Sequence, residues 1–169
     1  DGTISLLALD TEVHLASASG DNFQPLIDIF AGPGKVTFNR DKELVIGFRF
    51  RPKAPGEGSA FHRIMRPQGV AIAILNMAGW VKISSDGSLE DVRISCGPAG
   101  PKPFRAYKTE AYLKGKVWKD STFKEANQIL AGEVSLRTSA HRATKEYRFK
   151  LLPVLLKTVL DKAIDRAER

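Results

Sequence analysis

The stretch that decides the fold is FHRIMRPQGVAIAILNMAGW, Phe61–Trp80. Its second part, Val70–Ala78, is the most continuously apolar run in the chain, and only Asn76 interrupts it. A short apolar run of this kind, bounded by turn residues, is typical of a strand that is covered on both faces. The sequence therefore predicts that the protein folds around a buried strand in this region.

Directly before this run lies a cluster of three cations: His62, Arg63 and Arg66. A sharp turn is predicted right after them, at Pro67–Gly69. Cations that are held on rigid backbone beside a turn are suited to an anionic ligand. An ordinary edge strand with charges on its open side explains the same pattern without any ligand. The pattern alone favours the edge strand and leaves the ligand site open.

Upstream of the core strand, two segments have the composition of strands, Thr11–Ala16 and Glu43–Phe50. In the second, alternate positions place four apolar residues on one face: Leu44, Ile46, Phe48 and Phe50. Between the two strands, Pro25–Phe30 is predicted to form a short helical turn that opens with proline. The loop signal is strongest at Pro52–Gly58, where we place the boundary between two sub-structures.

Downstream, three strands of an antiparallel sheet are predicted at Ala60–Met65, Ile72–Ile83 and Leu89–Cys96. The last two are joined at Ser84–Ser88, where the pair Asp86–Gly87 predicts a hairpin turn with positive φ.

The rest of the chain is predicted to be helical. The first helix covers Arg105–Leu113, and the second is capped by Asp120 or Ser121. The last helix runs from about Ala140 to Arg166, with an apolar face formed by Tyr147, Leu151, Leu155 and Val159 and with Pro153 inside it. Strands followed by helices predict an α+β fold, in which a small antiparallel sheet is covered by helices on one face.

Composition limits the possible partners and compartments. The chain has 169 residues, a net charge of +7 and one cysteine, Cys96. The charge favours either an anionic partner or a basic solvated surface. A single cysteine excludes an internal disulfide and an iron–sulfur cluster held by this chain alone. No charged-then-apolar leader is present, so a cytoplasmic protein is expected. Because the sequence begins at Asp1, we expect it to be a piece of something longer.

Three other candidate sites have weak support. The loop Gly32–Lys35 lacks the downstream Gly-Lys-Ser/Thr of a phosphate loop. The histidines His14, His62 and His141 have no metal-ligand spacing, so no metal site is predicted. The basic residues around the last helix alternate with acidic ones and lack an aromatic platform, so a nucleic-acid-binding module is only an alternative.

Several motifs together resemble a known family. Ser5–Val13, SLLALDTEV, is similar to the LLALDAEV segment of the flavin subunits of molybdenum hydroxylases, which include the xanthine dehydrogenases and aerobic carbon monoxide dehydrogenase. Pro25–Lys35, Glu43–Val45, Ser59–Ala78 and Glu146–Leu156 resemble further motifs of that family in the same order and spacing. The resemblance covers nearly the whole chain.

The resemblance implies a domain organisation. Residues 1–52 would be the C-terminal part of the FAD-binding domain, the remainder of a flavin-binding subdomain. Residues 58–169 would form the flavoprotein C-terminal domain, with an antiparallel sheet at 59–96 and a helical bundle at 105–166. The glycine-rich loops that hold the FAD pyrophosphate in the family would precede this chain. The chain alone is therefore expected to hold FAD weakly or not at all, and to be inactive.

The resemblance also implies four cofactor-binding residues and no catalytic residue. Asp1 matches an aspartate that bonds the polyol chain of FAD, and Phe38 matches a leucine that packs at the flavin. His62 stands where relatives have a lysine near the isoalloxazine, and it is charged only when protonated. Arg66 matches an arginine on the same loop.

The mechanism that the resemblance implies is an electron relay. A subunit with the molybdenum cofactor oxidises the substrate, and an iron–sulfur subunit passes the electrons to FAD. FAD hands them to NAD or another acceptor, while this protein positions and tunes the flavin. Two alternatives are a basic nucleic-acid-binding module and a subunit-docking domain with no ligand of its own.

Overall fold

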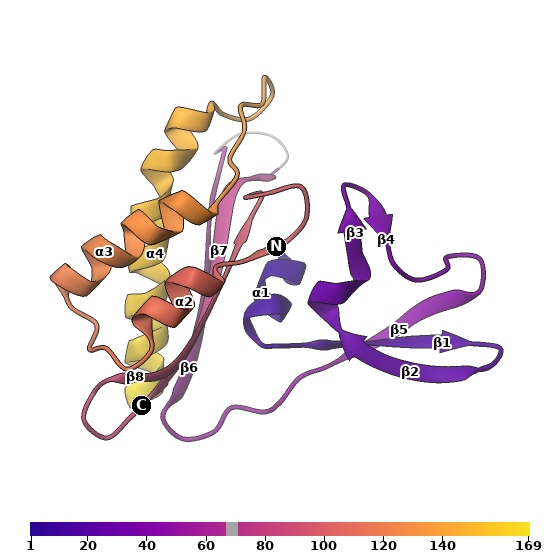
Figure 1. Ribbon diagram of the computed structural model, residues 1–169, viewed down its shortest axis with the longest axis horizontal. Coiled ribbons are helices and arrows are strands. Elements are labelled where there is room, and N and C mark those ends of the chain that lie inside the picture. The colour runs from indigo at the N-terminus through magenta and orange to yellow at the C-terminus, as the bar shows by residue number, and fades with distance from the viewer. Residues whose placement is uncertain (67–70) are drawn as a thin grey trace.

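The computed structural model describes residues 1–66 and 71–169, and its main feature is a four-stranded antiparallel sheet (Figure 1). The strands are β6 (Glu57–Met65), β7 (Ala73–Ile83), β8 (Leu89–Gly97) and β9 (Phe104–Arg105), and they lie in the order β6-β7-β8-β9. β7 pairs with both β6 and β8 and is buried from Ala73 to Val81. The predicted core strand and the predicted antiparallel sheet are thus both present.

Three helices cover one face of this sheet, and a fourth lies on the other face (Figure 1). The three are α2 (Tyr107–Leu113), α3 (Asp120–Glu133) and α4 (Lys145–Glu168), and the fourth is α1 (Gly2–Ala8). A Cβ added to Gly79 would meet Val159 of α4, whereas the neighbouring Ala78 packs with Ile4 of α1. Alternate residues of β7 therefore face the helical bundle and α1, and the predicted α+β fold is confirmed.

A second, smaller group of strands lies beside the first (Figure 1). It contains β1 (Glu12–Ser17), β2 (Gly20–Pro25) and β5 (Glu43–Arg49), in the order β2-β1-β5. A 3₁₀ turn, η1 (Leu26–Ile29), leads to the two-stranded ladder of β3 (Phe30–Gly32) and β4 (Lys35–Val36). Both strands predicted upstream and the helical turn between them are present, and each end lies within one residue of its predicted position.

Helix α1 contacts both groups of strands. Its residues Ile4 and Ala8 pack on Ala78 of β7, and its Leu7 belongs to the core of the small sheet together with Val13. The buried hydroxyl of Ser95 in β8 also donates a hydrogen bond to the carbonyl of Ile4. The small sheet and the large sheet are therefore joined by one helix as well as by the loop before β6.

Helix α4 lies directly on β6 at its C-terminal end. A Cβ added to Gly58 would come within 2.0 Å of the carbonyl oxygen of Ala163 and within 2.6 Å of the amide nitrogen of Ala167. Both are backbone atoms, so neither can rotate out of the way. This close contact requires glycine at the start of β6.

Two helix starts differ from those expected. Asp120 is the first residue of α3, and Lys119 before it makes no side-chain capping bond, so the predicted cap is wrong. α4 begins at Lys145, five residues after Ala140, because the hydroxyl of Thr144 accepts a hydrogen bond from the amide of Tyr147 and caps the helix there.

The hairpin predicted between β7 and β8 is present. Of the pair Asp86–Gly87, only Gly87 has the positive φ that was expected of both residues. Gly87 has a φ of 81°, and Asp86 is absent from the residues with positive φ in the described ranges. Asp86 instead accepts hydrogen bonds from both the amide and the hydroxyl of Ser88, which stabilise the turn through its side chain.

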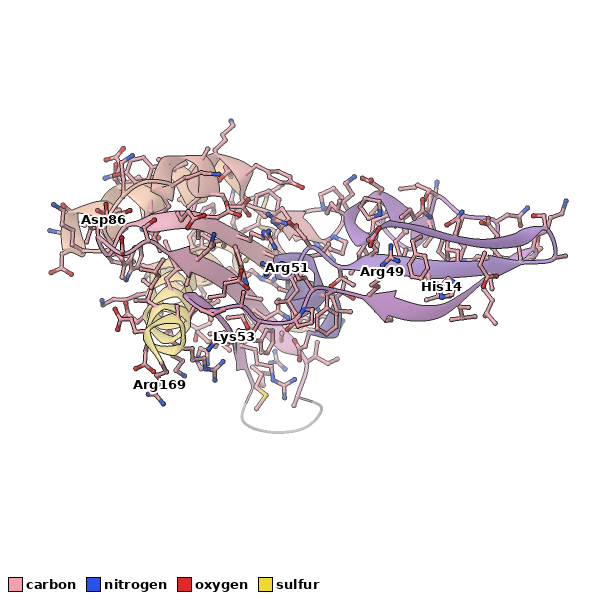
Figure 2. The ribbon with its side chains drawn as sticks, turned by 90° about the horizontal axis from the view of Figure 1, so that it is seen from below. His14, Arg49, Arg51, Lys53, Asp86 and Arg169 are labelled. Carbon is pink, nitrogen blue, oxygen red and sulfur yellow. The ribbon has the colours of Figure 1, made fainter. Side chains whose placement is uncertain are left out.

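Glu57, the first residue of β6, anchors the loop that links the two sheets. Arg51 donates a hydrogen bond of 2.5 Å to this buried carboxylate, and the amide of Ala54 donates another of 3.0 Å. Figure 2 shows Arg51 and Lys53 along the loop. Burial disfavours the charged carboxylate, but the hydrogen bonds and the charges of Arg51 and Lys82 outweigh it and lower the pKa of Glu57 from 4.5.

Acid should therefore weaken this anchor. A carboxyl whose pKa falls on folding stabilises the native state above its ordinary pKa, and this contribution is lost as the pH falls below that value. We expect the free energy of unfolding in urea to decline less between about pH 5 and about pH 3 in Glu57→Gln than in the wild type. Glu125→Gln, on the exposed side of α3, should decline as the wild type does. Equal declines in all three proteins would contradict this role.

Candidate functional site

The carboxylate of Asp1 lies at the centre of the candidate site. The side-chain amide of Asn76 donates a hydrogen bond of 2.5 Å to its Oδ1, and Arg63 donates to its Oδ2 and forms an ion pair with it. Arg63 of β6 and Asn76 of β7 are opposite each other in the strand register. Both side chains therefore point to the face of the sheet on which α1 begins.

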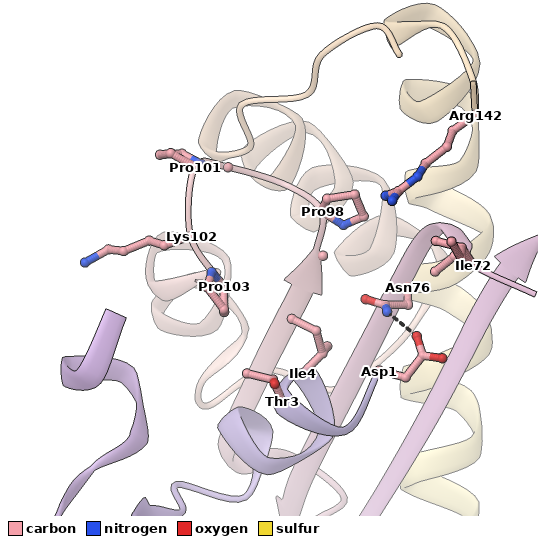
Figure 3. Close-up of a pocket in the computed structure, with 13 residues that line it drawn as sticks. Asp1, Thr3, Ile4, Ile72, Asn76, Pro98, Pro101, Lys102, Pro103 and Arg142 are labelled. Carbon is pink, nitrogen blue, oxygen red and sulfur yellow. Dashed lines mark hydrogen bonds between the residues drawn. The ribbon is translucent and has the colours of Figure 1, made fainter. Parts of the chain in front are cut away.

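A cavity of about 360 Å³ opens beside this group (Figure 3). It lies between the start of α1, the start of β7 and the loop that follows β8. Its walls are largely apolar and its charged lining residues come from three different segments. The residues that line it are Asp1, Thr3, Ile4, Ile72, Ala73, Asn76, Gly97, Pro98, Gly100, Pro101, Lys102, Pro103 and Arg142.

Asn76 has an unsatisfied oxygen at this cavity. Its side chain is only 4% exposed, and its Oδ1 has no hydrogen-bond partner among the described residues. Because its amide nitrogen donates to Asp1, the amide oxygen must point the other way, toward the loop with Pro98 (Figure 3). A Cβ on Gly97 would lie 3.2 Å from this oxygen. The same Cβ would meet the side chain of Ile4 at 2.9 Å, so glycine there allows α1 to pack against β8.

The structure places the four residues predicted to contact the cofactor in different surroundings. Asp1 lines the cavity, while Phe38 packs against the core of the small sheet. His62 is opposite Met77 in the register and points to the face that carries α4, away from Asp1. Arg66 is exposed and follows the end of β6. Their contacts with a flavin remain predictions.

The cation cluster is divided by the pleat of β6. Arg63 and His62 are adjacent in the sequence and so point to opposite faces of the sheet. β6 is an edge strand of the large sheet, as the simpler interpretation of the cluster required. The turn predicted at Pro67–Gly69 lies outside the described residues.

Sequence reasoning missed two residues of this site. Asn76 was noted only as the residue that interrupts the apolar run, although a buried amide in a core strand requires a hydrogen-bond partner. Arg63 was one of the three cations, and the alternation of β6 separates it from His62. A signal for both residues was therefore present, but their partner, Asp1, is 75 residues away from Asn76 in the sequence.

The first turn of α4 contains a buried cation, Arg148. It is 2% exposed, and its Nε has no hydrogen-bond partner among the residues that the structure describes. Burial, together with the positive charges of Arg142 and Arg137, lowers the pKa of Arg148 below that of an ordinary arginine.

Other reactive groups are inaccessible or dispersed. Burial raises the pKa of the Cys96 thiol to about 12, so this cysteine is not a nucleophile at neutral pH. Across residues 1–66 and 71–169, no three His, Cys, Asp or Glu side chains are grouped so that they could hold a metal ion. Within the same ranges, no helix has the length and apolar character to cross a membrane.

The family model for the CO dehydrogenase flavoprotein C-terminal domain matches residues 59–163. The chain therefore belongs to this family. A putative xanthine dehydrogenase FAD-binding subunit of Escherichia coli is 27% identical over 169 residues, covering 99% of this chain and 56% of that protein. The medium chain of a glyceraldehyde dehydrogenase of Sulfolobus acidocaldarius is 28% identical over 155 residues, covering 92% of this chain and 53% of that protein.

Solved structures show the same fold. A reconstituted CO dehydrogenase from Oligotropha carboxidovorans has a chain that matches 99% of this one with a TM-score of 0.88 at 21% identity. Quinoline 2-oxidoreductase from Pseudomonas putida matches the whole chain with a TM-score of 0.84 at 20% identity. In both cases the match covers 57% of the other chain. The chain thus spans somewhat more than half the length of the relatives that it resembles.

Proposed function

We propose that this chain carries the C-terminal portion of the FAD-binding subunit of a molybdenum hydroxylase, similar to xanthine and carbon monoxide dehydrogenases. Residues 1–52 would complete the FAD-binding domain, and residues 58–169 would form the flavoprotein C-terminal domain. The match of residues 59–163 to the family and the FAD-binding relative from Escherichia coli support this proposal. The chain would then be a component of a cytoplasmic oxidoreductase whose substrate is bound by another subunit.

The observation that carries the proposal is the position of Asp1. The resemblance assigns this residue to the polyol chain of FAD, and the structure holds its carboxylate between Arg63 and Asn76 at the mouth of a cavity. A carboxylate that is fixed by two donors on a rigid sheet is preorganised to accept further hydrogen bonds from hydroxyl groups.

The other groups at the cavity also fit a polyol. The Oδ1 of Asn76 has no partner among the described residues, and it would accept a hydrogen bond from a hydroxyl that reached it. When it is bound, the flavin supplies the electron transfer that side chains cannot provide. The residues of this chain would bind and orient the polyol and keep water from the buried amide.

A test of this proposal measures binding of FAD to the purified chain by saturation-transfer NMR, which detects weak complexes. We expect transfer to the protons of both the polyol and the flavin ring. Asp1→Ala should weaken binding about tenfold, because a hydrogen bond to a charged group contributes roughly 1.5 kcal/mol or more. Asp120→Ala, on the exposed start of α3, should bind FAD as the wild type does.

Equal binding by the wild type and Asp1→Ala would contradict the proposal, because it would show that FAD does not use this carboxylate.

A group of exposed apolar side chains favours a second role in assembly. Leu44, Ile46, Phe48 and Phe50 on and just after β5 are between 49% and 68% exposed. The prediction that they share one face is wrong, because a bulge at Ile46 breaks the alternation of β5: Leu44 is opposite Ala16, whereas Phe48 is opposite the buried Val13. All four remain exposed among the described residues. Side chains of this kind in a row are typical of a protein interface. We propose that the partners of the assembled enzyme are subunits with the molybdenum cofactor and the iron–sulfur clusters, with NAD or another molecule as the electron acceptor.

A further inference from the structure

The outer face of the first half of α4 combines apolar and basic side chains. Tyr147 and Val154 are 45% and 50% exposed, and their spacing of two helical turns places them on the same side of the helix. Lys150 lies between them, one turn from each, and is also exposed. In Figure 1 the first turns of α4 lie above α3, so this side of the helix faces solvent.

Two more cations lie at the start of this face. Lys145 is the first residue of α4, and its amide donates a hydrogen bond of 3.0 Å to the hydroxyl of Thr138. Because Arg137 directly precedes Thr138, this bond brings Arg137 close to the start of the helix. Both cations are exposed, and neither forms an ion pair within the described part of the chain. We call the following residues the α4 surface: Arg137, Lys145, Tyr147, Lys150 and Val154.

The positive charge of the α4 surface is reinforced by its surroundings. Arg148, on the inner side of the same helical turn, is 2% exposed, and the neighbouring charges that lower its pKa are those of Arg142 and Arg137. Residues 134–160 contain six arginines and lysines but one acidic residue, Glu146. A surface with such an imbalance of charge attracts a partner of the opposite sign and steers its approach.

We propose that the α4 surface is a docking site for an acidic amphipathic helix of a partner protein. Carboxylates of that helix pair with Arg137, Lys145 and Lys150, and one of its apolar side chains lies between Tyr147 and Val154. Arginine and tyrosine are residue types that concentrate binding energy at protein interfaces. An apolar helix stripe that is flanked by charges is suited to a second helix with the complementary pattern.

A nucleic acid fits this surface less well. Single strands bind through several aromatic side chains on which successive bases stack. Tyr147 is the one aromatic residue of the α4 surface, and Val154, its apolar neighbour, gives a base no aromatic ring to stack on. The inference does not depend on the flavin proposal, because none of these residues lines the cavity beside Asp1.

The probe for this surface is a labelled helical peptide with a leucine stripe flanked by glutamates, and its binding to the purified chain is measured by fluorescence anisotropy. The same peptide with glutamine in place of each glutamate should bind about tenfold more weakly, because three exposed ion pairs are lost. The affinity of the glutamate peptide should also fall when sodium chloride is raised from about 50 to about 300 mM, since salt screens exposed charges.

Variants with an equal loss of charge locate the binding site. Replacing all three cations of the α4 surface with glutamine should weaken the glutamate peptide about tenfold. The control replaces Lys35, Arg40 and Lys42, three exposed cations in β4 and the loop after it, and should leave binding unchanged. Val154→Ser should weaken binding about threefold, because less apolar area is buried. Val117→Ser, at a position that is 49% exposed between α2 and α3, should bind as the wild type does.

The proposal is overturned if the glutamate peptide does not bind, or if the glutamate and glutamine peptides bind equally. An equal loss of binding in the two triple variants would also overturn it, because net charge alone would then explain the attraction. So would equal binding by Val154→Ser and Val117→Ser. Tighter binding of an oligothymidine of about twelve nucleotides, lost in the α4-surface variant, would show a nucleic-acid site instead. None of these results affects the flavin proposal, which is tested on Asp1.

Discussion

Replacing Gly58 with alanine is expected to lower the free energy of unfolding by about 3 kcal/mol, the upper end of the usual range for overpacked sites. The added methyl group would lie 2.0 Å from the carbonyl oxygen of Ala163 and 2.6 Å from the amide of Ala167. Both belong to the backbone of α4, so relief requires the whole helix to move away from β6. The measurement is urea unfolding followed by the fluorescence of Trp80 and Trp118.

Gly132 provides the matched control for this substitution. It lies in α3, and a Cβ at this position meets nothing within 4 Å. Alanine there should stabilise the protein by about 0.5–1 kcal/mol, because glycine disfavours a helix. If Gly58→Ala is as stable as Gly132→Ala, α4 does not lie on β6 as the structure shows.

Replacing Glu110 with leucine is expected to destabilise the protein by about 3 kcal/mol, because it leaves a buried guanidinium without its main partner. The buried carboxylate of Glu110 binds Arg105 at 2.7 and 2.9 Å. It also accepts a hydrogen bond of 2.8 Å from the amide of Ile94 in β8. Arg105 retains contacts with Asp10 and the carbonyl of Leu7, which is why the lower end of the range for a broken buried pair is expected.

A double variant separates the loss of the pair from the loss of volume. Glu110→Leu combined with Arg105→Met removes both charges, and it should recover part of the stability that the single variant loses. Thermal unfolding of the two proteins gives the comparison, with Glu125→Leu on the exposed side of α3 as the control. A double variant that is less stable than Glu110→Leu alone would show that Arg105 acts mainly through Asp10 and Leu7.

Much of the fold could be predicted from local patterns in the sequence. The apolar run of β7 and the Asp86–Gly87 hairpin define the large sheet, since both depend only on neighbouring residues. Helix α1 was not predicted, because seven residues are too few to show a helical period. Tyr147 is 45% exposed although its spacing predicts the buried face of α4, because the first turn buries the neighbouring Arg148 in its place.

Less of the candidate site could be predicted. The cation cluster and Asp1 were recognised, but which residues point toward Asp1 depends on strand register, which the sequence does not state directly. Register places Asn76 opposite Arg63 and His62 opposite Met77. The unsatisfied amide oxygen depends on a contact between the first residue and the core strand, and contacts over such a separation leave no local pattern.

The position of α1 has a consequence for how the chain holds together. The helix precedes the small sheet in the sequence but packs on β7 and β8, which follow it. The small sheet is therefore inserted in the sequence between α1 and the strands β6–β8, which pack against α1. A cut in the loop between β5 and β6 is expected to leave the two pieces associated, because Ile4 and Ala8 stay packed against Ala78 and the half-buried Phe61. The loop between β5 and β6 is the covalent link between the two units, whereas α1 holds them together by packing against both.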